Sequence, residues 1–262
     1  MKLLLKISAA LILVISLASF LIPKAVNSNK TLKNPLHKGF AFVELYTSEG
    51  CSSCPPADEV FRKIQGEYKN MKVYLLAFHV DYWNRLGWKD IFSQSSYSTR
   101  QRQYAEWLKL ESVYTPQAIV NGKTEFIGSE EGKLRNSIKS QLNQSDSWEL
   151  SLSSPRMESK SVITHFNINQ SPGAHYSINL ALVQKYGISH VQGGENEGRT
   201  LSHVQIVRNL KTQNLGNSTQ GDIRIDLPEG FSTKDLELIA FIQNQNSGEI
   251  LSATQSPISP SL

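Results

Sequence analysis

Thr47-Ser-Glu-Gly-Cys-Ser-Ser-Cys-Pro-Pro56 places the two cysteines of this 262-residue chain, Cys51 and Cys54, on a turn between two apolar segments. The run before the turn, Phe40–Tyr46, is compact, apolar and aromatic, which predicts a buried strand. After the turn, apolar residues recur at helical spacing. Because proline is favoured in the first helical turn, we expect a helix to begin at one of the two prolines.

The segments that follow predict an α/β domain. They are a buried strand over Val73–Val80, a helix over Ser98–Leu108, a strand over Ser112–Val120, a strand over Thr124–Ile127 and a helix over 130–143. Parallel strands joined by a helix form a β-α-β unit, and Asn121-Gly122 is a strong hairpin turn. The predicted order β-α-β-α-β-β-α, with Cys-x-x-Cys between the first strand and the first helix, is the thioredoxin-like arrangement.

The sequence changes after about residue 146 to short alternating segments separated by Gly, Ser, Asn and Pro. These segments are Trp148–Leu152, Val162–Ile168, Tyr176–Val183, Val204–Val207, Asp222–Leu227 and Leu236–Ile242. The pattern predicts a smaller all-β, sandwich-like domain. We therefore expect a thioredoxin-like domain over 39–145, a β-rich domain over 146–256 and a loose tail over 257–262.

The first 28 residues have the pattern of a secretory signal peptide or an N-terminal anchor. Lys2 and Lys6 form a basic n-region, Ile7–Ile22 is apolar apart from serines, and Ala25–Ser28 is the best candidate for a cleavage site. We expect an exported protein, periplasmic or extracellular, with residues 29–38 as a polar linker. Contact with a membrane is expected only through the N-terminal segment, if that segment stays uncleaved.

Composition excludes several classes of protein. Hydrophobic residues make up 39% of the chain and charged residues 19%, which describes a globular protein with a real core. Residues 1–28 hold three lysines and no acidic residue, so without them 24 basic residues face 23 acidic ones and the net charge falls from +4 to about +1. No basic stripe indicates nucleic-acid binding.

The spacing of Cys51 and Cys54 indicates chemistry rather than stability. A disulfide between them closes almost no loop, so its stabilising effect should be small. The amino end of a helix favours a thiolate. We expect Cys51 to be the exposed, attacking sulfur and Cys54 the more buried, resolving one, although the two prolines leave fewer N–H groups to face Cys51.

Thr115-Pro116 leads into the third strand, where a thioredoxin-like fold carries a cis-proline loop against the dithiol. We expect Pro116 to shape a docking groove for an extended partner, with Thr115 beside it. The alternative is an ordinary trans proline at the start of a strand.

His79 and the aromatic loop after it lie at the same edge of the predicted sheet as the cysteines. Cys51, Cys54 and His79 could hold copper, although a lone histidine at the end of a buried strand is more often structural. Asp81 could carry a proton to Cys54 or cap the loop. The remaining candidates form either a partner-binding rim or a plug for their own domain, and they are Tyr82, Trp83 and Trp88.

The glycine-rich segment Gly193–Arg199 lacks the features of a phosphate loop. It is expected to be a long hairpin that packs on the first domain and presents three polar residues there. Those residues are Glu195, Asn196 and Arg199. His203 and Arg208 are expected on the following strand as structural polar residues.

Four blocks of the sequence resemble a bacterial family of secreted thioredoxin-like proteins, domain-of-unknown-function family twelve twenty-three. They are Val43–Asp58, Phe78–Asp90, Tyr114–Gly122 and Gly194–His203. The resemblance implies a thioredoxin-like N-terminal domain with its cysteine pair at Cys51 and Cys54, and a β-rich C-terminal part. Asn84 and Asn121 stand where aspartate is usual in the family. The lack of a carboxylate at Asn84 weakens an acid/base role for the aromatic loop.

These observations favour an exported thiol–disulfide oxidoreductase that needs no cofactor beyond its own disulfide. Its partners would be protein or small-molecule thiols and disulfides, with no nucleic acid. One alternative is a module that handles copper or another soft metal through the two cysteines and His79. Another is a non-enzymatic binding protein on a thioredoxin-like scaffold.

Overall fold

The structure is a computed structural model that describes residues 39–228, 230 and 233–258. The chain divides into the units Met1–Leu36 and His37–Leu262, and all described residues belong to the second. The expected signal segment 1–28 and linker 29–38 lie outside the described residues. Among the described helices, none is long and apolar enough to cross a membrane.

Twelve strands, three α-helices and three short 3-10 helices make up the described chain. The first part contains β1 (Ala41–Thr47), α2 (Pro55–Tyr68), β2 (Val73–His79), η1 (Asn84–Leu86), α3 (Ser95–Leu108), β3 (Gln117–Val120), β4 (Thr124–Ile127) and α4 (Glu131–Leu142). The second part contains β5 (Leu150–Leu152), β6 (Arg156–Glu158), β7 (Ser161–Ile168), β8 (Tyr176–His190), η2 (Gly194–Asn196), β9 (Thr200–Asn214), β10 (Gln220–Asp226), η3 (Thr233–Asp235), β11 (Leu236–Asn244) and β12 (Ile250–Pro257).

The order of elements predicted for the first part, β-α-β-α-β-β-α, is confirmed. β1 lies centrally, parallel to β2 and antiparallel to β3, and β4 pairs with β3 as the predicted hairpin. Asn121 and Gly122 both have positive φ, as the predicted hairpin turn requires. The sheet thus turns the carboxyl ends of β1 and β2 toward the same edge, where the cysteine turn and the aromatic loop begin.

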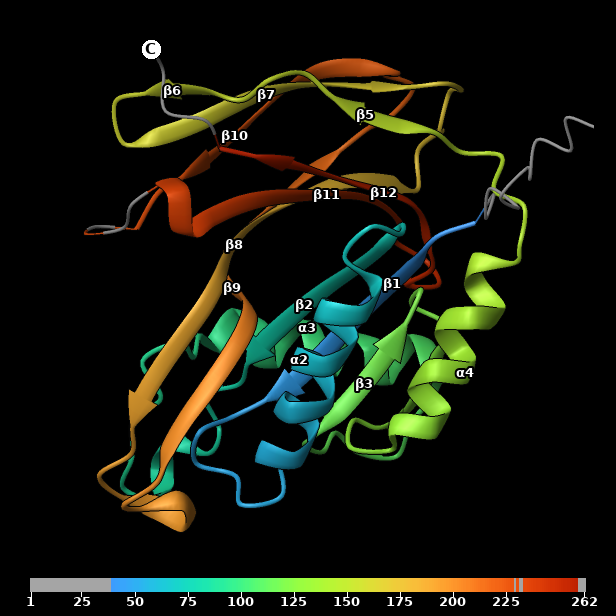
Figure 1. Ribbon diagram of the computed structural model, residues 1–262. Helices are drawn as coiled ribbons and strands as arrows, with labels where there is room; N and C mark the ends of the chain where they lie inside the picture. Colours follow the sequence, from blue (N-terminus) through green and yellow to red (C-terminus); the bar gives the residue numbers. More distant parts are fainter. Residues whose placement is uncertain (1–38, 229, 231–232, 259–262) are drawn as a thin grey trace, which may run out of the picture. The chain divides into compact units, whose positions relative to one another are not determined.

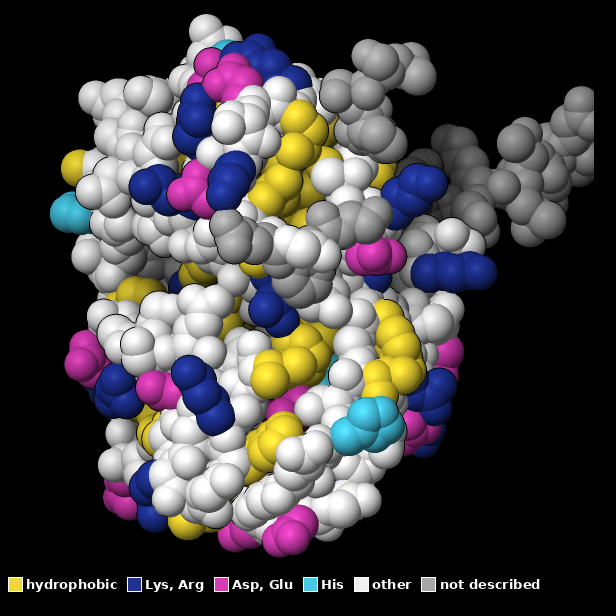
Figure 2. Space-filling model, turned by 90° about the vertical axis from the view of Figure 1, so that its left-hand side faces the viewer, with side chains coloured by type: hydrophobic (Ala, Val, Ile, Leu, Met, Phe, Trp, Pro, Cys, Tyr) yellow, Lys and Arg dark blue, Asp and Glu magenta, His cyan; other side chains and the backbone are white. Residues whose placement is uncertain are grey.

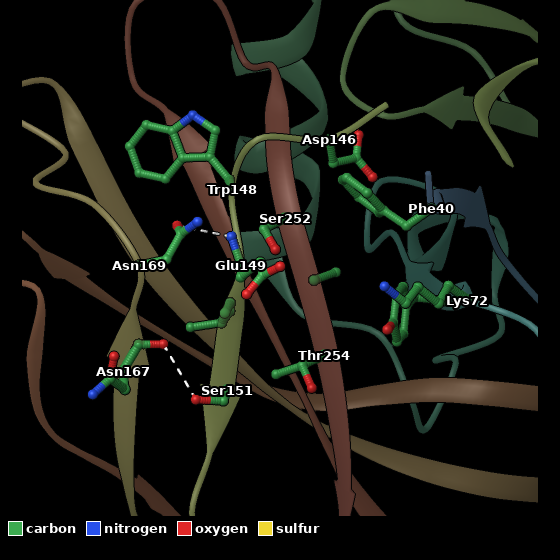
Figure 3. A pocket seen from close by; sticks show the side chains of 13 residues that line it. Phe40, Lys72, Asp146, Trp148, Glu149, Ser151, Asn167, Asn169, Ser252 and Thr254 are labelled. Carbon is green, nitrogen blue, oxygen red and sulfur yellow. Dashed lines mark hydrogen bonds between the residues drawn. The ribbon is translucent and has the colours of Figure 1, made fainter. Parts of the chain in front are cut away.

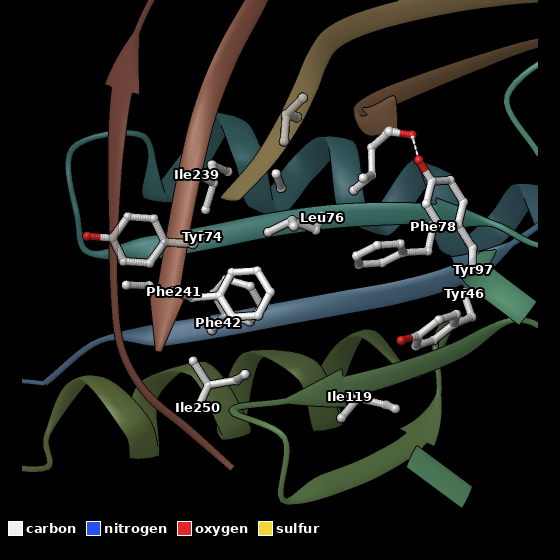
Figure 4. Packing of buried hydrophobic residues seen from close by; sticks show 14 of the residues in the cluster. Phe42, Tyr46, Tyr74, Leu76, Phe78, Tyr97, Ile119, Ile239, Phe241 and Ile250 are labelled. Carbon is white, nitrogen blue, oxygen red and sulfur yellow. Dashed lines mark hydrogen bonds between the residues drawn. The ribbon is translucent and has the colours of Figure 1, made fainter. Parts of the chain in front are cut away.

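Successive side chains of β1 point to opposite faces of the sheet, and each face is covered by helices. Val43 and Leu45 pack against α2 and α4, whose buried faces include Phe61 and Ile138. Phe42 and its neighbours on the other face pack against α3 and against β11, where the rings of Phe42 and Phe241 lie 4.5 Å apart (Figure 4). β1 is buried on both faces, which accounts for a sequence that is apolar apart from Glu44 and Thr47.

The second part of the chain continues the same sheet and adds a second one. The large mixed sheet has the order β12-β11-β8-β9-β2-β1-β3-β4, and the small sheet has the order β10-β7-β5 with β6 on β7. The small sheet lies over β8, β11 and β12 (Figure 1). A third apolar cluster fills the space between the two layers. The segments expected as two domains therefore share one sheet through β9 and β2, which pair in parallel.

β12 was not predicted from the sequence, and it extends into the expected tail. Pro257, expected in a loose tail, is paired with Glu237 of β11, and Ile258 is buried. Residues 259–262 of that tail lie outside the described residues.

Candidate active site

The two cysteines form a disulfide on the turn between β1 and α2. Cys54 is the N-cap of α2, and Pro55 and Pro56 occupy its first positions, as predicted. The first available N–H groups of the helix, those of Ala57 and Asp58, both donate to the Cys54 carbonyl. Since the prolines lack an N–H, no helix-end donor in this turn is left over for Cys51.

The expectation that Cys51 is exposed is wrong. The side chains of Cys51 and Cys54 both have 0% exposure, whereas Ser52 and Ser53 between them are exposed. The sequence places Cys51 at the start of a turn but does not reveal the loops that close over it. In the structure these loops come from β8–β9 and from the segment after β2.

The loop between β8 and β9 covers the cysteine turn, and we call Gly193–Arg199 the cap loop. The fully buried Asn196 donates through Nδ2 to the carbonyl oxygens of Glu49 at 2.8 Å and of Cys51 at 2.9 Å. Glu195 accepts a 2.9 Å hydrogen bond from the Ser52 N–H. Glu195 and Asn196 thus contact the first part as expected, whereas Arg199 donates to Asn196 Oδ1 at 2.7 Å within the cap loop itself.

Thr115 brings its hydroxyl group to the sulfur of Cys51. Thr115 Oγ1 donates to Cys51 Sγ at 3.2 Å, and the indole N–H of Trp83 donates to Thr115 Oγ1 at 2.8 Å. The peptide bond between Thr115 and Pro116 is cis, the alternative that the sequence analysis preferred. Ser53 Oγ lies 3.3 Å from the same sulfur. Hydroxyl groups, rather than backbone dipoles, are therefore the donors that reach Cys51.

Replacing Thr115 by valine should raise the pKa of the Cys51 thiol in the reduced protein by about one unit. A hydrogen bond to a charged group contributes about 1.5–3 kcal/mol, and one pKa unit corresponds to about 1.4 kcal/mol. The measurement is the pH dependence of Cys51 alkylation in the Cys54→Ser background. Thr99→Val, at an exposed position of α3, is the matched control. An unchanged pKa in Thr115→Val would show that this hydroxyl does not stabilise the thiolate.

Asp81 is engaged by α3 rather than by the cysteines. The Asp81 carboxylate accepts a 2.5 Å hydrogen bond from Ser98 Oγ. The Asp81 backbone N–H donates to that hydroxyl oxygen at 3.1 Å. Asp81 was expected either to carry a proton to Cys54 or to cap the loop, and these contacts are those of a loop cap.

The aromatic loop is tied to its own domain. Tyr82 donates to Gln101, and Trp88 donates through Nε1 to Glu49 Oε2 at 2.6 Å. Together with the bond from Trp83 to Thr115, each ring of the expected rim is half-buried and hydrogen-bonded inward. These contacts are those of side chains that pack on their own domain, rather than of a rim that binds a partner.

Five buried ionisable side chains lie under the same turn, and we call them the acid–histidine cluster. They are Glu49, Asp58, His79, Asp90 and His203. His79 Nδ1 lies 2.7 Å from Asp90 Oδ2, and the rings of His79 and His203 lie 4.7 Å apart. His203 Nδ1 is 3.3 Å from Asp58 Oδ2, and its Nε2 is 3.6 Å from Glu49 Oε1.

Sequence reasoning missed three members of this cluster and assigned His203 only a structural role. Glu49 lies in the cysteine turn itself, and Asp58 lies four residues after Cys54, so both were in view. What the sequence lacks is a local signal that β9, more than 120 residues away, returns His203 to them. Acidic residues in a first helical turn are ordinarily explained by the helix dipole.

The copper site considered for Cys51, Cys54 and His79 is not assembled. His79 is occupied by Asp90 on one nitrogen, and its ring packs edge-on against Phe92 and His203. Within the described ranges, no group of three or more His, Cys, Asp or Glu side chains is arranged to hold a metal ion.

A separate pocket of about 340 Å³ lies where the first part of the chain meets β5 and β12. Phe40, Lys72, Asp146 and Trp148 are among its lining residues, and Figure 3 shows the polar side chains of β5 and β7 around it. None of the residues predicted for the site lines this pocket.

On the face shown in Figure 2, basic and acidic side chains are interspersed.

The chain is similar to a protein family and to solved structures. A family model described as "Protein of unknown function (DUF1223)" matches residues 42–243. The crystal structure of protein AGR_C_4864 from Agrobacterium tumefaciens is 25% identical, with a TM-score of 0.63, over 85% of this chain and 96% of that chain. A domain of the outer membrane lipoprotein Omp28 from Porphyromonas gingivalis is 10% identical with a TM-score of 0.32, over 45% of this chain and 92% of that chain, which is too low for a structural conclusion. No curated protein matches the chain.

Proposed function

The chain belongs to the DUF1223 family of unknown function, and from its disulfide site we propose that it is a thiol–disulfide oxidoreductase on a thioredoxin-like scaffold. The observation that carries the proposal is the hydrogen bond from Thr115 Oγ1 to the sulfur of Cys51. A disulfide that served only as a staple would need no donor aimed at one of its sulfurs. A donor at that position favours the thiolate that exchange requires.

The arrangement of the first part of the chain supports the same proposal. The sheet order β2-β1-β3-β4, with α2 and α4 on one face and α3 on the other, is that expected of a thioredoxin-like domain. The Cys51–Cys54 disulfide lies where the dithiol of such a domain would lie, between the first strand and the first helix. A short loop of this kind adds little stability, so its retention favours a chemical role.

The proposed reaction is an exchange between the disulfide and the thiols of a partner. A partner thiolate attacks Cys51 Sγ, the Cys51–Cys54 bond breaks, and Cys54 leaves with the electron pair and takes up a proton. A second partner thiolate attacks the partner sulfur of the mixed disulfide, and Cys51 leaves as a thiolate. The partner is oxidised to a disulfide by two electrons, the protein is reduced to the dithiol, and the reverse sequence reduces a partner disulfide.

Because both sulfurs are buried, the proposal includes a displacement of the cap loop that admits the partner thiol. Pro116 and Thr115 would then border the opened site. An exported location, expected from residues 1–28, suits a protein whose stable form carries the disulfide.

The reduction potential of the Cys51–Cys54 pair, measured by equilibration with glutathione, tests the proposal. A catalytic disulfide is expected to equilibrate with the glutathione couple at a potential above about −300 mV, whereas an inert structural disulfide lies below that value. In the reduced protein, Cys51 should react with an alkylating reagent at pH 6, and Cys51→Ser should remove that reaction. A potential below this limit, together with an unreactive Cys51, would overturn the proposal in favour of a structural role.

A further inference from the structure

His203 lies between two carboxylates directly under the cysteine turn, and the exchange reaction above does not use it. Its Nδ1 is 3.3 Å from Asp58 and its Nε2 is 3.6 Å from Glu49, yet neither nitrogen has a well-formed hydrogen bond within the described part of the chain. The side chain is 1% exposed. Buried polar groups are normally hydrogen-bonded, so a buried imidazole held loosely between two acids needs an explanation.

The charges around His203 hold a proton on it. Burial lowers the pKa of His203, but the carboxylate of Asp58, followed by Glu49 and Asp90, outweighs burial and raises the pKa to about 10. The other ionisable groups at this position are His79, which is paired with Asp90, and Arg208, which lies over the Phe92 ring. At neutral pH the oxidised protein therefore stores a proton on His203.

Asp58 lies beside His203 and follows Cys54 by one turn of the same helix. Side chains four residues apart on a helix lie on the same face, one turn from each other, and the Asp58 N–H donates to the Cys54 carbonyl at 3.2 Å. Both side chains are buried, with exposures of 0% for Cys54 and 7% for Asp58. A thiolate that formed at Cys54 would be shielded from water and one helical turn from the Asp58 carboxylate, which accepts a hydrogen bond from Thr47 Oγ1. Both conditions favour the neutral thiol.

We propose that His203, acting through Asp58, supplies the proton that Cys54 takes up when the disulfide is reduced. The inference rests on the proposed oxidoreductase function. The electron pair of the broken S–S bond stays on Cys54 Sγ, a proton passes from His203 Nδ1 to Asp58, and Asp58 passes a proton to the sulfur. Neutral His203 then regains from solvent the proton that the attacking thiol lost when it ionised, so no further reactant is needed.

The experiment measures the second-order rate constant for reduction of the disulfide by dithiothreitol, divided by the thiolate fraction of the reagent, from pH 6 to pH 11. In the wild-type protein this quantity should be flat and then fall near pH 10 as His203 loses its proton. His203→Gln should lower it about a hundredfold at pH 7, the usual range for a general acid. A solvent deuterium isotope effect should be present in the wild type and lost in this variant.

Asp58→Asn gives a second test that a merely structural role would not satisfy. Because asparagine cannot relay a proton, Asp58→Asn should lower the rate at pH 7 to the level of His203→Gln and abolish the fall near pH 10. His165→Gln is the matched control, since His165 is also paired with an aspartate, Asp222, but is exposed on β7. It should leave the profile unchanged.

The possible failures are distinguishable. If the folded wild-type disulfide does not exchange with thiols at any pH, the oxidoreductase function and this inference both fail. If it exchanges and folded His203→Gln is within twofold of the wild type, only the proton-donor role fails. If His203→Gln does not fold, a folded Asp58→Asn protein that keeps the wild-type rate and the fall near pH 10 overturns the inference by itself.

Discussion

Replacing Asn196 by alanine is expected to speed reduction of the Cys51–Cys54 disulfide by a small thiol between about tenfold and a hundredfold. Asn196 holds the cap loop down through its two hydrogen bonds to the carbonyl oxygens of Glu49 and Cys51. A hydrogen bond contributes about 0.5–1.5 kcal/mol net, so the loss of two shifts the opening equilibrium by about 1–3 kcal/mol. If the sulfurs react only when the cap loop is displaced, the rate of reduction rises in proportion to the population of that open state.

The rate should be measured at fixed pH and low urea, so that global unfolding does not contribute. Glu197→Ala is the control, because Glu197 is an exposed residue of the same loop. Glu195→Gln should give a smaller increase, since it weakens one exposed bond to Ser52. An Asn196→Ala protein that reacts as slowly as the wild type would show that the cap loop does not limit access, and that thiols reach the disulfide by another route.

Local patterns of the sequence were sufficient for the first part of the fold. The run Phe40–Tyr46 is apolar because β1 is buried on both faces, and Asn121-Gly122 carries the positive φ values of its hairpin. The prolines after Cys54 mark the start of α2. Each of these signals is encoded within a few residues, which is why it could be interpreted without the rest of the chain.

The surroundings of the cysteines could not be predicted in this way. Cys51 is buried by the cap loop, and His203 joins Asp58 only because β9 pairs with β2 more than 100 residues along the chain.

β12 was missed for a different reason. Its Ser, Thr and Gln residues have the composition of a loop, and its pairing with β11 determines its conformation.

A buried ion pair also explains why the two parts of the chain should unfold together. Arg100 of α3 makes a bidentate contact with Glu44 of β1, at 2.9 Å from Nε and 2.7 Å from Nη2, and donates to Gln243 of β11 at 3.1 Å. Tyr46 and Tyr104 donate their hydroxyl protons to the same carboxylate. The guanidinium therefore joins the central strand of the first part to a strand of the second.

Replacing Arg100 by methionine is expected to lower the free energy of unfolding by about 3–5 kcal/mol, because it leaves the 1%-exposed Glu44 carboxylate without its counter-charge. Removing both charges in Arg100→Met/Glu44→Met should recover more than half of this loss, since two apolar groups leave no buried charge. Urea unfolding monitored by fluorescence and by far-ultraviolet circular dichroism measures both values. The two signals should coincide for the wild type, because β1, α3 and β11 share this contact. A loss below 1 kcal/mol, or two separate transitions, would mean that the interface around Arg100 does not couple the sheet's two halves.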